Sequence, residues 1–431
     1  MGTAPMTTPE SAAPASAAAE GARYRCRFCR ASLRATFVDL GMSPLCQTHV
    51  SPERLGEMEP FYPLHAFVCE QCFLVQLPEM VAPAAIFSEY AYFSSFSDSW
   101  VEHARRYCEA ICERLQLGRQ SRVMEIASND GYLLQHFVAK GIPALGIEPA
   151  ENIARAAIDK GIPTVVKFFG RAAAAELAAE HGRPQLLIGN NVLAHVPDLN
   201  DFVAGLKALL APRGVITMEF PHLRRLMREN QFDTIYHEHF SYFSFCTAER
   251  VFAHHGLTLF DVEELPTHGG SLRIYARHQE DCAMPVSDAV RNLRDSEVRE
   301  GFLSLGCYRS FAEQVKATKR NLLAFLIEAK RAGKRIAGYG APGKGNTLLN
   351  YCGIRTDFLD YTVDANPYKQ GKFTPGTRIP IFAPGKIRET RPDLILILPW
   401  NLRDEIVQTA SYVREWGGAF VVPIPEVALV P

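Results

Sequence analysis

The stretch "RVMEIASNDGYLLQHFVAKGIPALGIEP", residues 122–149, predicts the fold of the middle of the chain. "RVMEIA" and "ALGIEP" are short, mostly apolar runs that predict buried strands, and "YLLQHFVAKG" between them has helical spacing. A turn of small and polar residues, 128–131, joins the first strand to the helix. Because a strand, a helix and a second strand in this order form a βαβ unit, we expect an α/β domain with a parallel sheet.

The turn and the acid at the end of the second strand indicate what this unit binds. A small-residue turn at a helix N-terminus lets a ligand approach the backbone, and a carboxylate there can accept hydrogen bonds from both ribose hydroxyls. The arrangement is typical of class I S-adenosylmethionine (SAM) methyltransferases, with an altered glycine pattern. The alternative is a Rossmann-like unit for another nucleotide, or for none. The expected cofactor contacts are Glu125, Ala127, Asn129, Asp130, Gly131, Glu148, Asn190 and Asn191.

Two histidine-containing segments follow later predicted strands. "NNVLAHVPD" (190–198) comes after "QLLIG", and "YHEHFSY" (236–242) comes after "GVITMEFP". Open α/β sheets bind ligands at the carboxyl ends of their strands, so we expect both segments near the cofactor. Histidine has the side-chain pKa nearest neutral pH, and an adjacent carboxylate or tyrosine can orient it. A hydrogen-bonded structural role is the alternative for His195.

A metal site is the rival interpretation of "YHEHFSY". If the segment is extended, Glu238 points away from His237 and His239, because successive side chains of a strand alternate between its two faces. This alternation argues against one shared metal ion and favours proton transfer.

Two Cys-x-x-Cys pairs near the N-terminus predict a zinc site. In "CRFC" (26–29) and "CEQC" (69–72), the two-residue spacing places both thiolates on one side of a tight turn. Four thiolates close the tetrahedral shell of Zn²⁺, which indicates a structural role. Redox-active or merely buried cysteines are the alternative, and Cys46 could replace one ligand. The expected ligands are Cys26, Cys29, Cys69 and Cys72.

A glycine-rich segment predicts a second Rossmann-like domain at the C-terminus. "GYGAPG" (338–343) satisfies the dinucleotide pattern, and Asp364 follows it by about 20 residues. Taken alone, this pattern predicts a nicotinamide-dependent oxidoreductase. Pro342 interrupts the turn, however, and Lys344 would neutralise phosphate, so the diphosphate of a nucleotide sugar suits the site equally well. A scaffold domain is the third interpretation. The expected substrate contacts here are Gly340, Gly343, Lys344, Asn346, Asp364 and Lys369.

Composition limits the class of protein. With 431 residues, a net charge of −1 and 22% charged residues, the chain has no basic surplus for nucleic acid. Its apolar runs are all shorter than the roughly 20 residues of a membrane span. We expect a cytoplasmic α/β enzyme that binds a small molecule, in an unknown oligomeric state. The expected parts are a disordered tail (1–22), a zinc-binding domain (23–85), a SAM-binding domain (86–285) and a Rossmann-like domain (286–431).

From about residue 24 to the C-terminus, the chain resembles the deoxysugar C-methyltransferases. Seven blocks carry the resemblance: the two Cys-x-x-Cys pairs together, "EYAYFSS", "EIASNDGYLL", "NNVLAHVPD", "YHEHFSY", "HGGSLR" and "GYGAPGKGN". Seven blocks in this order are far more specific than any one of them. The resemblance implies a zinc-binding N-terminal domain, a SAM-binding middle domain and a C-terminal domain that holds a thymidine-diphosphate sugar.

The resemblance also implies a reaction, which is methylation of a carbon next to a 4-keto group. At the matching positions His239 would be the base, with Tyr236 and Glu238 beside it. His195 and Tyr90 would line the sugar, although Tyr92 could take the place of Tyr90. We expect the base to remove the α-proton, a neighbouring tyrosine or histidine to stabilise the enolate, and the carbanion to take the SAM methyl group. Carbons 3 and 5 both flank the ketone, and we expect carbon 3, the commoner activity of the family.

Overall fold

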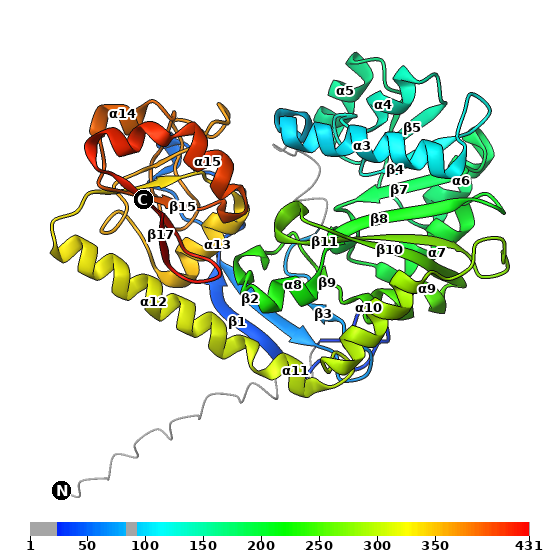
Figure 1. Cartoon of the computed structure of the whole chain (residues 1–431), viewed down its shortest axis with the longest axis horizontal. Helices are drawn as coiled ribbons and strands as arrows, with labels where there is room; N and C mark the ends of the chain where they lie inside the picture. Colours follow the sequence, from blue (N-terminus) through cyan, green and yellow to red (C-terminus); the bar gives the residue numbers. More distant parts are fainter. Residues whose placement is uncertain (1–23, 83–92, 431) are drawn as a thin grey trace, which may run out of the picture.

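The computed structural model describes residues 24–82 and 93–430. The expected tail, Tyr90 and Tyr92 lie outside the described residues. In Figure 1 the middle domain stands at the right and the C-terminal domain at the left, and strands β1 and β2 run between them. Among the described residues, no helix combines the length and the apolar character needed to cross a membrane.

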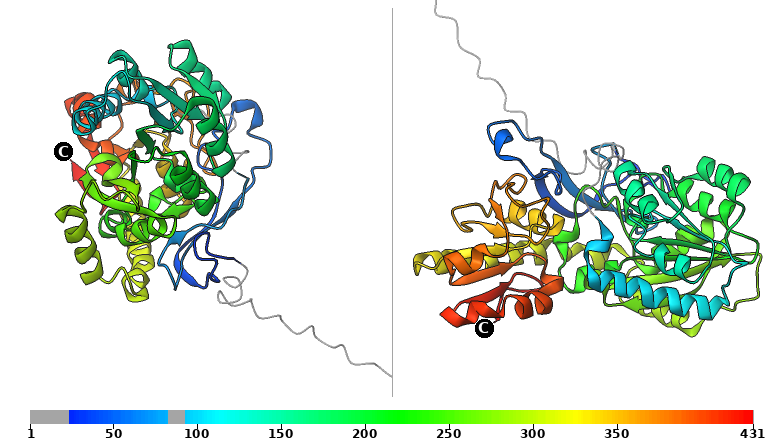
Figure 2. Two further views of the ribbon diagram at one scale, coloured as in Figure 1. Left: turned by 90° about the vertical axis from the view of Figure 1, so that its right-hand side faces the viewer. Right: turned by 90° about the horizontal axis from the view of Figure 1, so that it is seen from above.

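The N-terminal sheet joins the domains. Its strand order is β1-β2-β3-β9, and neighbouring strands are antiparallel. Between β1 and β2 the chain forms an arm with one 3₁₀ turn, η1 (Pro52–Arg54), which projects from the body in Figure 2. The fourth strand is part of "YHEHFSY", so this segment belongs to the N-terminal sheet as well as to the middle domain. The strands are β1 (Ala35–Ser43), β2 (Tyr62–Val68), β3 (Val75–Gln76) and β9 (Ser241–Tyr242).

The four predicted cysteine ligands lie together at one end of this sheet. Their sulfur atoms are all within 4.8 Å of one another, and Cys26 Sγ lies 3.5 Å from Cys72 Sγ. A tetrahedral zinc ion with four thiolates separates sulfurs by about 3.8 Å, so the cluster fits a closed structural zinc site. Cys46 is not part of the cluster, because its Sγ lies 3.6 Å from Glu238 Oε1.

Hydrogen bonds link the first Cys-x-x-Cys pair to the segment that carries "NNVLAHVPD". Arg27 Nη1 donates to Pro197 O at 2.7 Å, and Arg27 Nη2 donates to Leu77 O at 2.5 Å. In the other direction, Asn200 Nδ2 donates to Phe28 O at 2.9 Å. These bonds join a cysteine knuckle directly to the end of a middle-domain loop.

The middle domain is built on a seven-stranded sheet of order β10-β11-β8-β7-β4-β5-β6. The run from β8 to β6 is parallel, as the βαβ pattern predicts, and β10 and β11 are antiparallel. The strands are β4 (Val123–Ile126), β5 (Ala144–Glu148), β6 (Thr164–Val166), β7 (Leu186–Asn190), β8 (Val215–Pro221), β10 (Leu257–Leu265) and β11 (Ser271–His278).

Helices cover both faces of this sheet; in Figure 1, α3, α4 and α5 lie above it and α9 and α10 below it. The helix predicted for "YLLQHFVAKG" is shorter than expected, because turns occupy both of its ends. The helices are α3 (Asp98–Leu115), α4 (Leu134–Ala139), α5 (Glu151–Asp159), α6 (Arg171–His181), α7 (Leu199–Leu209), α8 (Leu223–Arg228), α9 (Phe245–His254) and α10 (Asp288–Arg299).

The C-terminal domain has the predicted Rossmann-like form. Its sheet has the order β14-β13-β12-β15-β16-β17, parallel except for the last strand. The strands are β12 (Ile336–Tyr339), β13 (Thr362–Val363), β14 (Ile381–Phe382), β15 (Leu394–Ile397), β16 (Ala419–Val422) and β17 (Ala428–Val430). The helices are α11 (Leu305–Arg309), α12 (Phe311–Arg331), α13 (Gly343–Cys352), α14 (Lys386–Thr390) and α15 (Arg403–Thr409).

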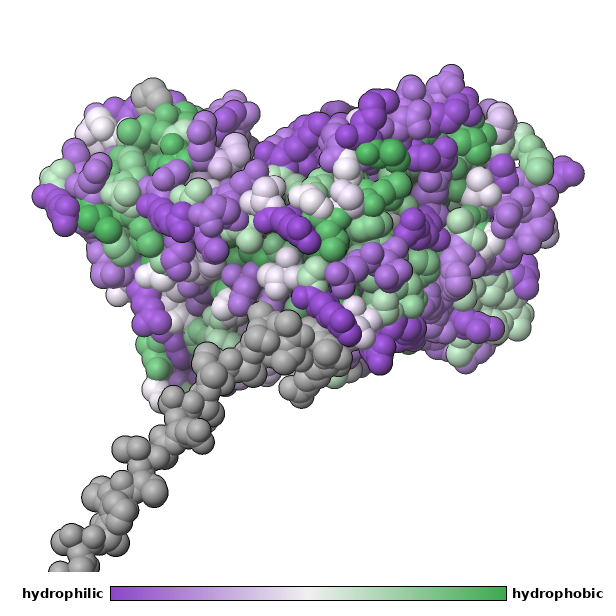
Figure 3. Space-filling view, turned by 90° about the horizontal axis from the view of Figure 1, so that it is seen from below, coloured by the Kyte–Doolittle hydropathy of each residue, from purple (hydrophilic) through white to green (hydrophobic). Residues whose placement is uncertain are grey.

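The hydrophobic cores cross the domain boundaries. One core contains Phe37 of β1, Leu226 of α8 and Leu348 of α13, and the Phe37 ring stacks on Phe311 with centroids 4.6 Å apart. On the face shown in Figure 3, hydrophilic side chains surround small groups of hydrophobic ones, and a notch separates the two lobes. The N-terminal sheet therefore shares buried apolar surface with both large domains, which fixes their relative position.

Loss of zinc should loosen the two segments that carry the site histidines. We expect Cys72→Ser to lower the zinc content from about one equivalent to less than half. Because the knuckle holds both the 193–197 loop and β9, amide hydrogen exchange should rise there and stay unchanged in β12. Metal analysis and hydrogen-exchange mass spectrometry would measure both effects.

The matched control is Cys282→Ser, which removes an exposed thiol outside the cluster. This variant should keep its zinc and its exchange pattern. Unchanged protection of the 193–197 loop in zinc-free Cys72→Ser protein would contradict the coupling.

Candidate active site

A cavity of about 640 Å³ lies where the three parts of the chain meet. The middle domain contributes the SAM-type turn, Glu148 and several aromatic side chains. The C-terminal domain contributes Pro342, Gly343, Lys344 and Lys369, and the loop after β1 contributes Gln47. The volume is in the range of small-molecule sites in proteins.

The turn after β4 has the geometry of a ligand-binding turn. Ala127, Asn129 and Gly131 all have positive φ, at 54°, 51° and 77°. Left-handed conformations cost a non-glycine residue about 1–3 kcal/mol, and such strain gathers at functional sites. At Gly131, a Cβ atom would lie 2.2 Å from Ile162 Cδ1, so packing as well as conformation requires glycine.

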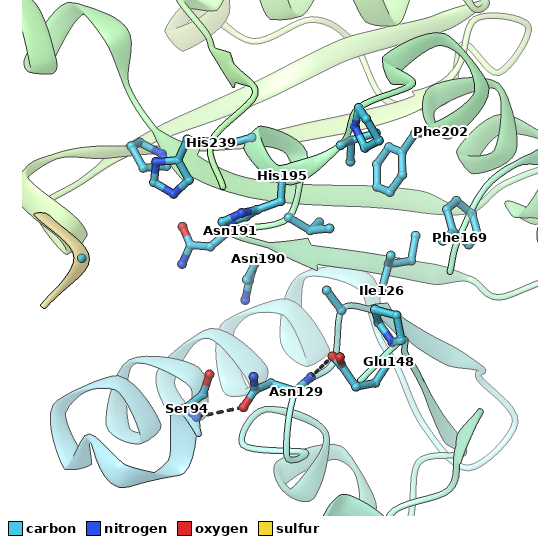
Figure 4. Close-up of a pocket in the computed structure, with 18 of the residues that line it drawn as sticks. Ser94, Ile126, Asn129, Glu148, Phe169, Asn190, Asn191, His195, Phe202 and His239 are labelled. Carbon is cyan, nitrogen blue, oxygen red and sulfur yellow. Dashed lines mark hydrogen bonds between the residues drawn. The ribbon is translucent and has the colours of Figure 1, made fainter. Parts of the chain in front are cut away.

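Glu148, at the end of β5, is held by two backbone groups. Asn129 N donates to Glu148 Oε2 at 3.0 Å, and Ala150 N donates to Oε1 at 2.9 Å. Figure 4 shows the first bond, and it also shows Ser94 bonded to the Asn129 side chain. Burial raises the pKa of Glu148, although both backbone hydrogen bonds oppose the rise. The fixed carboxylate can still accept hydrogen bonds from a ligand that enters the cavity.

The predicted cofactor contacts divide into two groups. Ala127, Asn129, Glu148, Asn190 and Asn191 line the cavity. Glu125, Asp130 and Gly131 are not among its lining residues. Asp130 instead forms an ion pair with Lys160 at 3.0 Å and accepts a short hydrogen bond from Ser95 Oγ, and burial raises the pKa of Glu125 well above its usual range.

An apolar section of the cavity adjoins Glu148. Ile126, Ile147, Phe169 and Phe202 line it, and the rings of Phe169 and Phe202 meet edge to face with centroids 5.4 Å apart. Figure 4 shows this section on the side of the cavity opposite His239. The arrangement suits a flat aromatic base. We did not predict either phenylalanine, because neither belongs to a recognisable motif.

His195 and His239 face each other at the other end of the cavity. Their ring centroids are 4.7 Å apart. His195 Nδ1 lies 2.8 Å from Glu238 O, and His239 Nδ1 lies 2.8 Å from Thr234 O. Since a carbonyl oxygen only accepts, we assign the proton of each ring to Nδ1 and the lone pair to Nε2.

Burial keeps both histidines neutral. It lowers the pKa of His195 to about 4 and the pKa of His239 well below its usual value. Each ring is therefore a proton acceptor at neutral pH. The cause is desolvation, which disfavours the charged imidazolium in the cavity.

The remaining residues of "YHEHFSY" point in different directions. The Tyr236 ring lies 4.0 Å from the His239 ring and lines the cavity. His237 Nε2 lies 3.2 Å from Pro63 O in the N-terminal sheet. The buried Glu238 carboxylate accepts a hydrogen bond from Cys46 Sγ. The main-chain oxygen of Glu238, not its side chain, is bonded to His195.

The extended conformation considered for this segment is wrong. Residues 237–238 form a turn, closed by the bond from His239 N to Tyr236 O at 2.8 Å. The turn separates the side chains more effectively than a strand would. Within residues 24–82 and 93–430, the only group of metal-ligating residues close enough to share an ion is the four-cysteine cluster.

The glycine-rich turn of the C-terminal domain meets the cavity at Pro342, Gly343 and Lys344. Lys344 Nζ donates to Asn401 Oδ1 at 2.8 Å and lies 4.6 Å from the Trp400 ring centroid. Gly340, with φ 88°, does not line the cavity. A Cβ atom at position 340 would lie 2.6 Å from Cδ of Pro399, so the close packing of this proline favours glycine.

Two other predicted substrate contacts, Asn346 and Asp364, form hydrogen bonds within the protein. Asn346 is buried and donates to Cys46 O at 2.7 Å. The Asp364 carboxylate accepts from Ala341 N and Asn366 N, both at 2.8 Å, and lies 3.3 Å from Lys369 Nζ. Glu148 also has two backbone donors, so the ion pair with Lys369 is what distinguishes Asp364 and already compensates its negative charge.

His268 is a cavity residue that the sequence analysis missed. It has φ 55°, and its buried Nδ1 has no hydrogen-bond partner within the described residues. The ring meets Trp100 edge-on, with centroids 4.8 Å apart. Burial lowers the pKa of His268 to about 4. The two glycines that follow it, with φ of 90° and 115°, were the signal available in the sequence.

Three family models match the chain in order. They are described as "Putative zinc binding domain" (residues 26–87), "Methyltransferase domain" (100–262) and "C-methyltransferase C-terminal domain" (266–425). The N-terminal match contains all four cysteines of the cluster. Together the matches cover most of the described residues.

Solved structures resemble a smaller part of the chain. Magnesium protoporphyrin IX methyltransferase (ChlM) from Synechocystis PCC 6803 with bound SAM is 15% identical, with a TM-score of 0.31, over 42% of this chain and 81% of that chain. A SAM-dependent methyltransferase from Clostridium acetobutylicum ATCC 824 is 11% identical, with a TM-score of 0.34, over 41% and 92%.

One curated relative matches over nearly the whole length. C-methyltransferase NovU from Streptomyces niveus is 37% identical over 404 residues, which are 93% of this chain and 95% of the relative. The family models follow the same order as the three parts of the structure, although the C-terminal model (266–425) also includes β11 and α10 of the middle domain. The chain therefore belongs to the deoxysugar C-methyltransferase family and is a SAM-dependent C-methyltransferase with a zinc-binding N-terminal domain.

Proposed function

We propose that the chain methylates a nucleotide-linked 4-keto-deoxysugar, with thymidine diphosphate as the nucleotide, at carbon 3 beside the ketone. One observation carries the proposal: two neutral histidines face a cavity that also contains the cofactor turn. SAM supplies an electrophilic methyl group, so the chain has only to generate a carbon nucleophile next to it. A C–H bond yields such a nucleophile when the resulting charge spreads onto an adjacent carbonyl oxygen.

His239 is the proposed base. Its Nδ1–H is bonded to Thr234 O, so Nε2 accepts the α-proton while the C–H electron pair forms the double bond of an enolate. His195, held through Glu238 O, faces the same space. Burial raises the pKa of Tyr236 well above its usual value, so its hydroxyl remains a hydrogen-bond donor. The nucleophilic carbon then takes the methyl group, and the carbonyl re-forms.

The proposed cofactor position follows from the polar groups at the Glu148 end. Glu148 accepts the ribose hydroxyls, and the apolar section with Phe169 and Phe202 encloses the adenine. Asn190 Oδ1 is buried and without a hydrogen-bond partner in the described part of the chain, so it can accept from the amino group of the cofactor. A cofactor held by these residues would present its methyl group to the histidine end of the cavity.

The nucleotide of the sugar is proposed to contact the C-terminal domain, at Lys369 and the start of α13. A helix N-terminus with a nearby lysine suits a diphosphate. The rival oxidoreductase function needs a carboxylate after β13 that can bind a ribose, and the ion pair of Asp364 with Lys369 weighs against it.

The direct test is mass spectrometry of a thymidine-diphosphate 4-keto-6-deoxysugar incubated with the protein and SAM. We expect a gain equal to one CH₂ group. In deuterated water without SAM, deuterium should enter at carbon 3. Entry at carbon 5 would move the reaction to the other side of the ketone, and SAM binding without any mass gain would contradict the proposed substrate.

His239→Asn tests the base. Because asparagine cannot accept the proton, we expect α-deuterium exchange and methylation both to be lost while SAM affinity is unchanged, as measured by calorimetry. His237→Asn is the matched control, since His237 lies in the same turn but faces Pro63. Exchange at the parental rate in His239→Asn would exclude His239 as the base.

Glu148→Ala tests the cofactor position. Loss of a charged hydrogen-bond acceptor should weaken SAM binding about tenfold or more, as measured by calorimetry. Glu151→Ala, at an exposed position three residues after Glu148 at the start of α5, should bind SAM as the parent does. Equal affinities for the two variants would remove Glu148 from the cofactor site.

A further inference from the structure

Lys344 forms no direct ion pair with a carboxylate among residues 24–82 and 93–430, and the buried Asp233 acts on it only from a distance. Its ammonium is bonded to an uncharged amide oxygen, Asn401 Oδ1, and lies against the face of Trp400. None of the ion pairs among the described residues includes it, whereas Lys369, in the same cavity, is paired with Asp364. Burial lowers the pKa of Lys344. A desolvated ammonium is costly unless an anion compensates it, so this site is suited to negative charge that arrives with a ligand.

The neighbours of Lys344 place this charge at the reacting end of the cavity. After burial itself, the positive charge of Lys344 is among the causes that lower the pKa of both His239 and His268. All three side chains line the same cavity. Glu148 lies at the opposite end, as Figure 4 shows for Glu148 and His239. The cavity is thus acidic where the cofactor is proposed to bind and cationic or neutral beside the proposed base.

A buried pair behind the cavity holds Lys344 in place. Trp400 Nε1 donates to Asp233 Oδ2 at 2.8 Å, and the same indole presents its face to the lysine. Asp233 is fully buried, and its Oδ1 has no hydrogen-bond partner within residues 24–82 and 93–430. Burial raises the pKa of Asp233 to about 7, and the charge of Lys344 opposes that rise. In return, the carboxylate helps Lys344 to stay protonated.

We propose that Lys344 is a further catalytic residue, which donates a hydrogen bond to the ketone oxygen of the substrate and stabilises the enolate. Asp233 and Trp400 are positioning residues that act through it. The proposal rests on the proposed function and assigns Lys344 to the sugar ketone rather than to the diphosphate.

The electrons balance without any additional reactant. As His239 Nε2 takes the α-proton, the C–H pair becomes the carbon–carbon double bond, and the carbonyl π pair moves to the oxygen beside Lys344. When the carbon takes the methyl group, the carbonyl re-forms and the electron pair of the broken sulfur–carbon bond stays on sulfur. An ammonium that is already in place stabilises this transient charge far better than water does.

Lys344→Gln separates the two roles that an unpaired lysine could have here. Two quantities are measured: the rate of α-deuterium exchange at saturating nucleotide sugar without SAM, and the affinity for thymidine diphosphate alone. We expect exchange to fall about 100-fold or more, the usual effect of removing one oxyanion donor. Affinity for thymidine diphosphate should stay within about threefold of the parent.

Three further measurements complete the test. Lys319→Gln is the matched control: Lys319 is bonded to Tyr351 O and lies 4.7 Å from the Tyr351 ring centroid, yet it does not line the cavity, and it should keep the parental exchange rate. Asp233→Asn should lower saturating exchange without changing KM for the sugar. SAM affinity and zinc content report folding of each variant.

The alternative outcomes are distinct. Parental exchange at saturation in Lys344→Gln, together with a tenfold or larger loss of thymidine diphosphate affinity, would make Lys344 a phosphate ligand and overturn the inference. Absence of both exchange and methylation in the parent protein would overturn the proposed function, and the inference with it.

Discussion

The pairing of β3 with β9 is the contact on which the rest of the site depends. It is short, with Val75 opposite Tyr242 and Gln76 opposite Ser241, but it continues in two further backbone bonds. Leu77 N donates to Phe240 O at 3.0 Å, and Phe240 N donates to Ala194 O at 2.7 Å. One row of hydrogen bonds therefore joins the cysteine-bearing sheet to the segment of His239 and to the loop of His195. The zinc-binding domain thus supports the segments of both histidines, and its loop after β1 adds Gln47 to the cavity wall.

This arrangement explains why the site needs three domains for a reaction that transfers one methyl group. The proposed cofactor contacts, the turn after β4 and Glu148, belong to the middle domain alone. The histidines belong to loops, which are usually mobile, and here backbone bonds and the rigid knuckle hold them. The C-terminal domain supplies the opposite wall, with a lysine and the start of α13. The position of the proposed base thus depends on contacts far from it in sequence.

The features predicted correctly are those that short-range patterns encode. The βαβ unit follows from apolar runs of the right length around a small turn, and the cysteine cluster follows from two-residue spacing. Other features depend on long-range contacts. The bond between β3 and β9 joins residues that share no local signal, and the orientation of Glu238 depends on a turn that its seven-residue segment does not specify. His268 was missed because a left-handed histidine before two glycines reads as an ordinary loop. Asp364 matches the dinucleotide spacing, but in the fold it forms an ion pair with Lys369. The roles of the individual site residues stay predictions.

The loop after β1 has a consequence for attempts to recombine these enzymes. Gly343 packs so closely on Cys46 that a Cβ atom would lie 2.9 Å from its Sγ, and Asn346 is bonded to the carbonyl of the same cysteine, 300 positions earlier in the chain. Cys46 also meets Glu238 of the middle domain. The C-terminal domain therefore depends on contacts with the loop after β1 and cannot be exchanged alone. A chimera cut between the middle and C-terminal domains would bring together an α13 and a Cys46 loop that had not evolved as a pair. A productive exchange of acceptor specificity would have to transplant both surfaces, although they come from opposite ends of the gene.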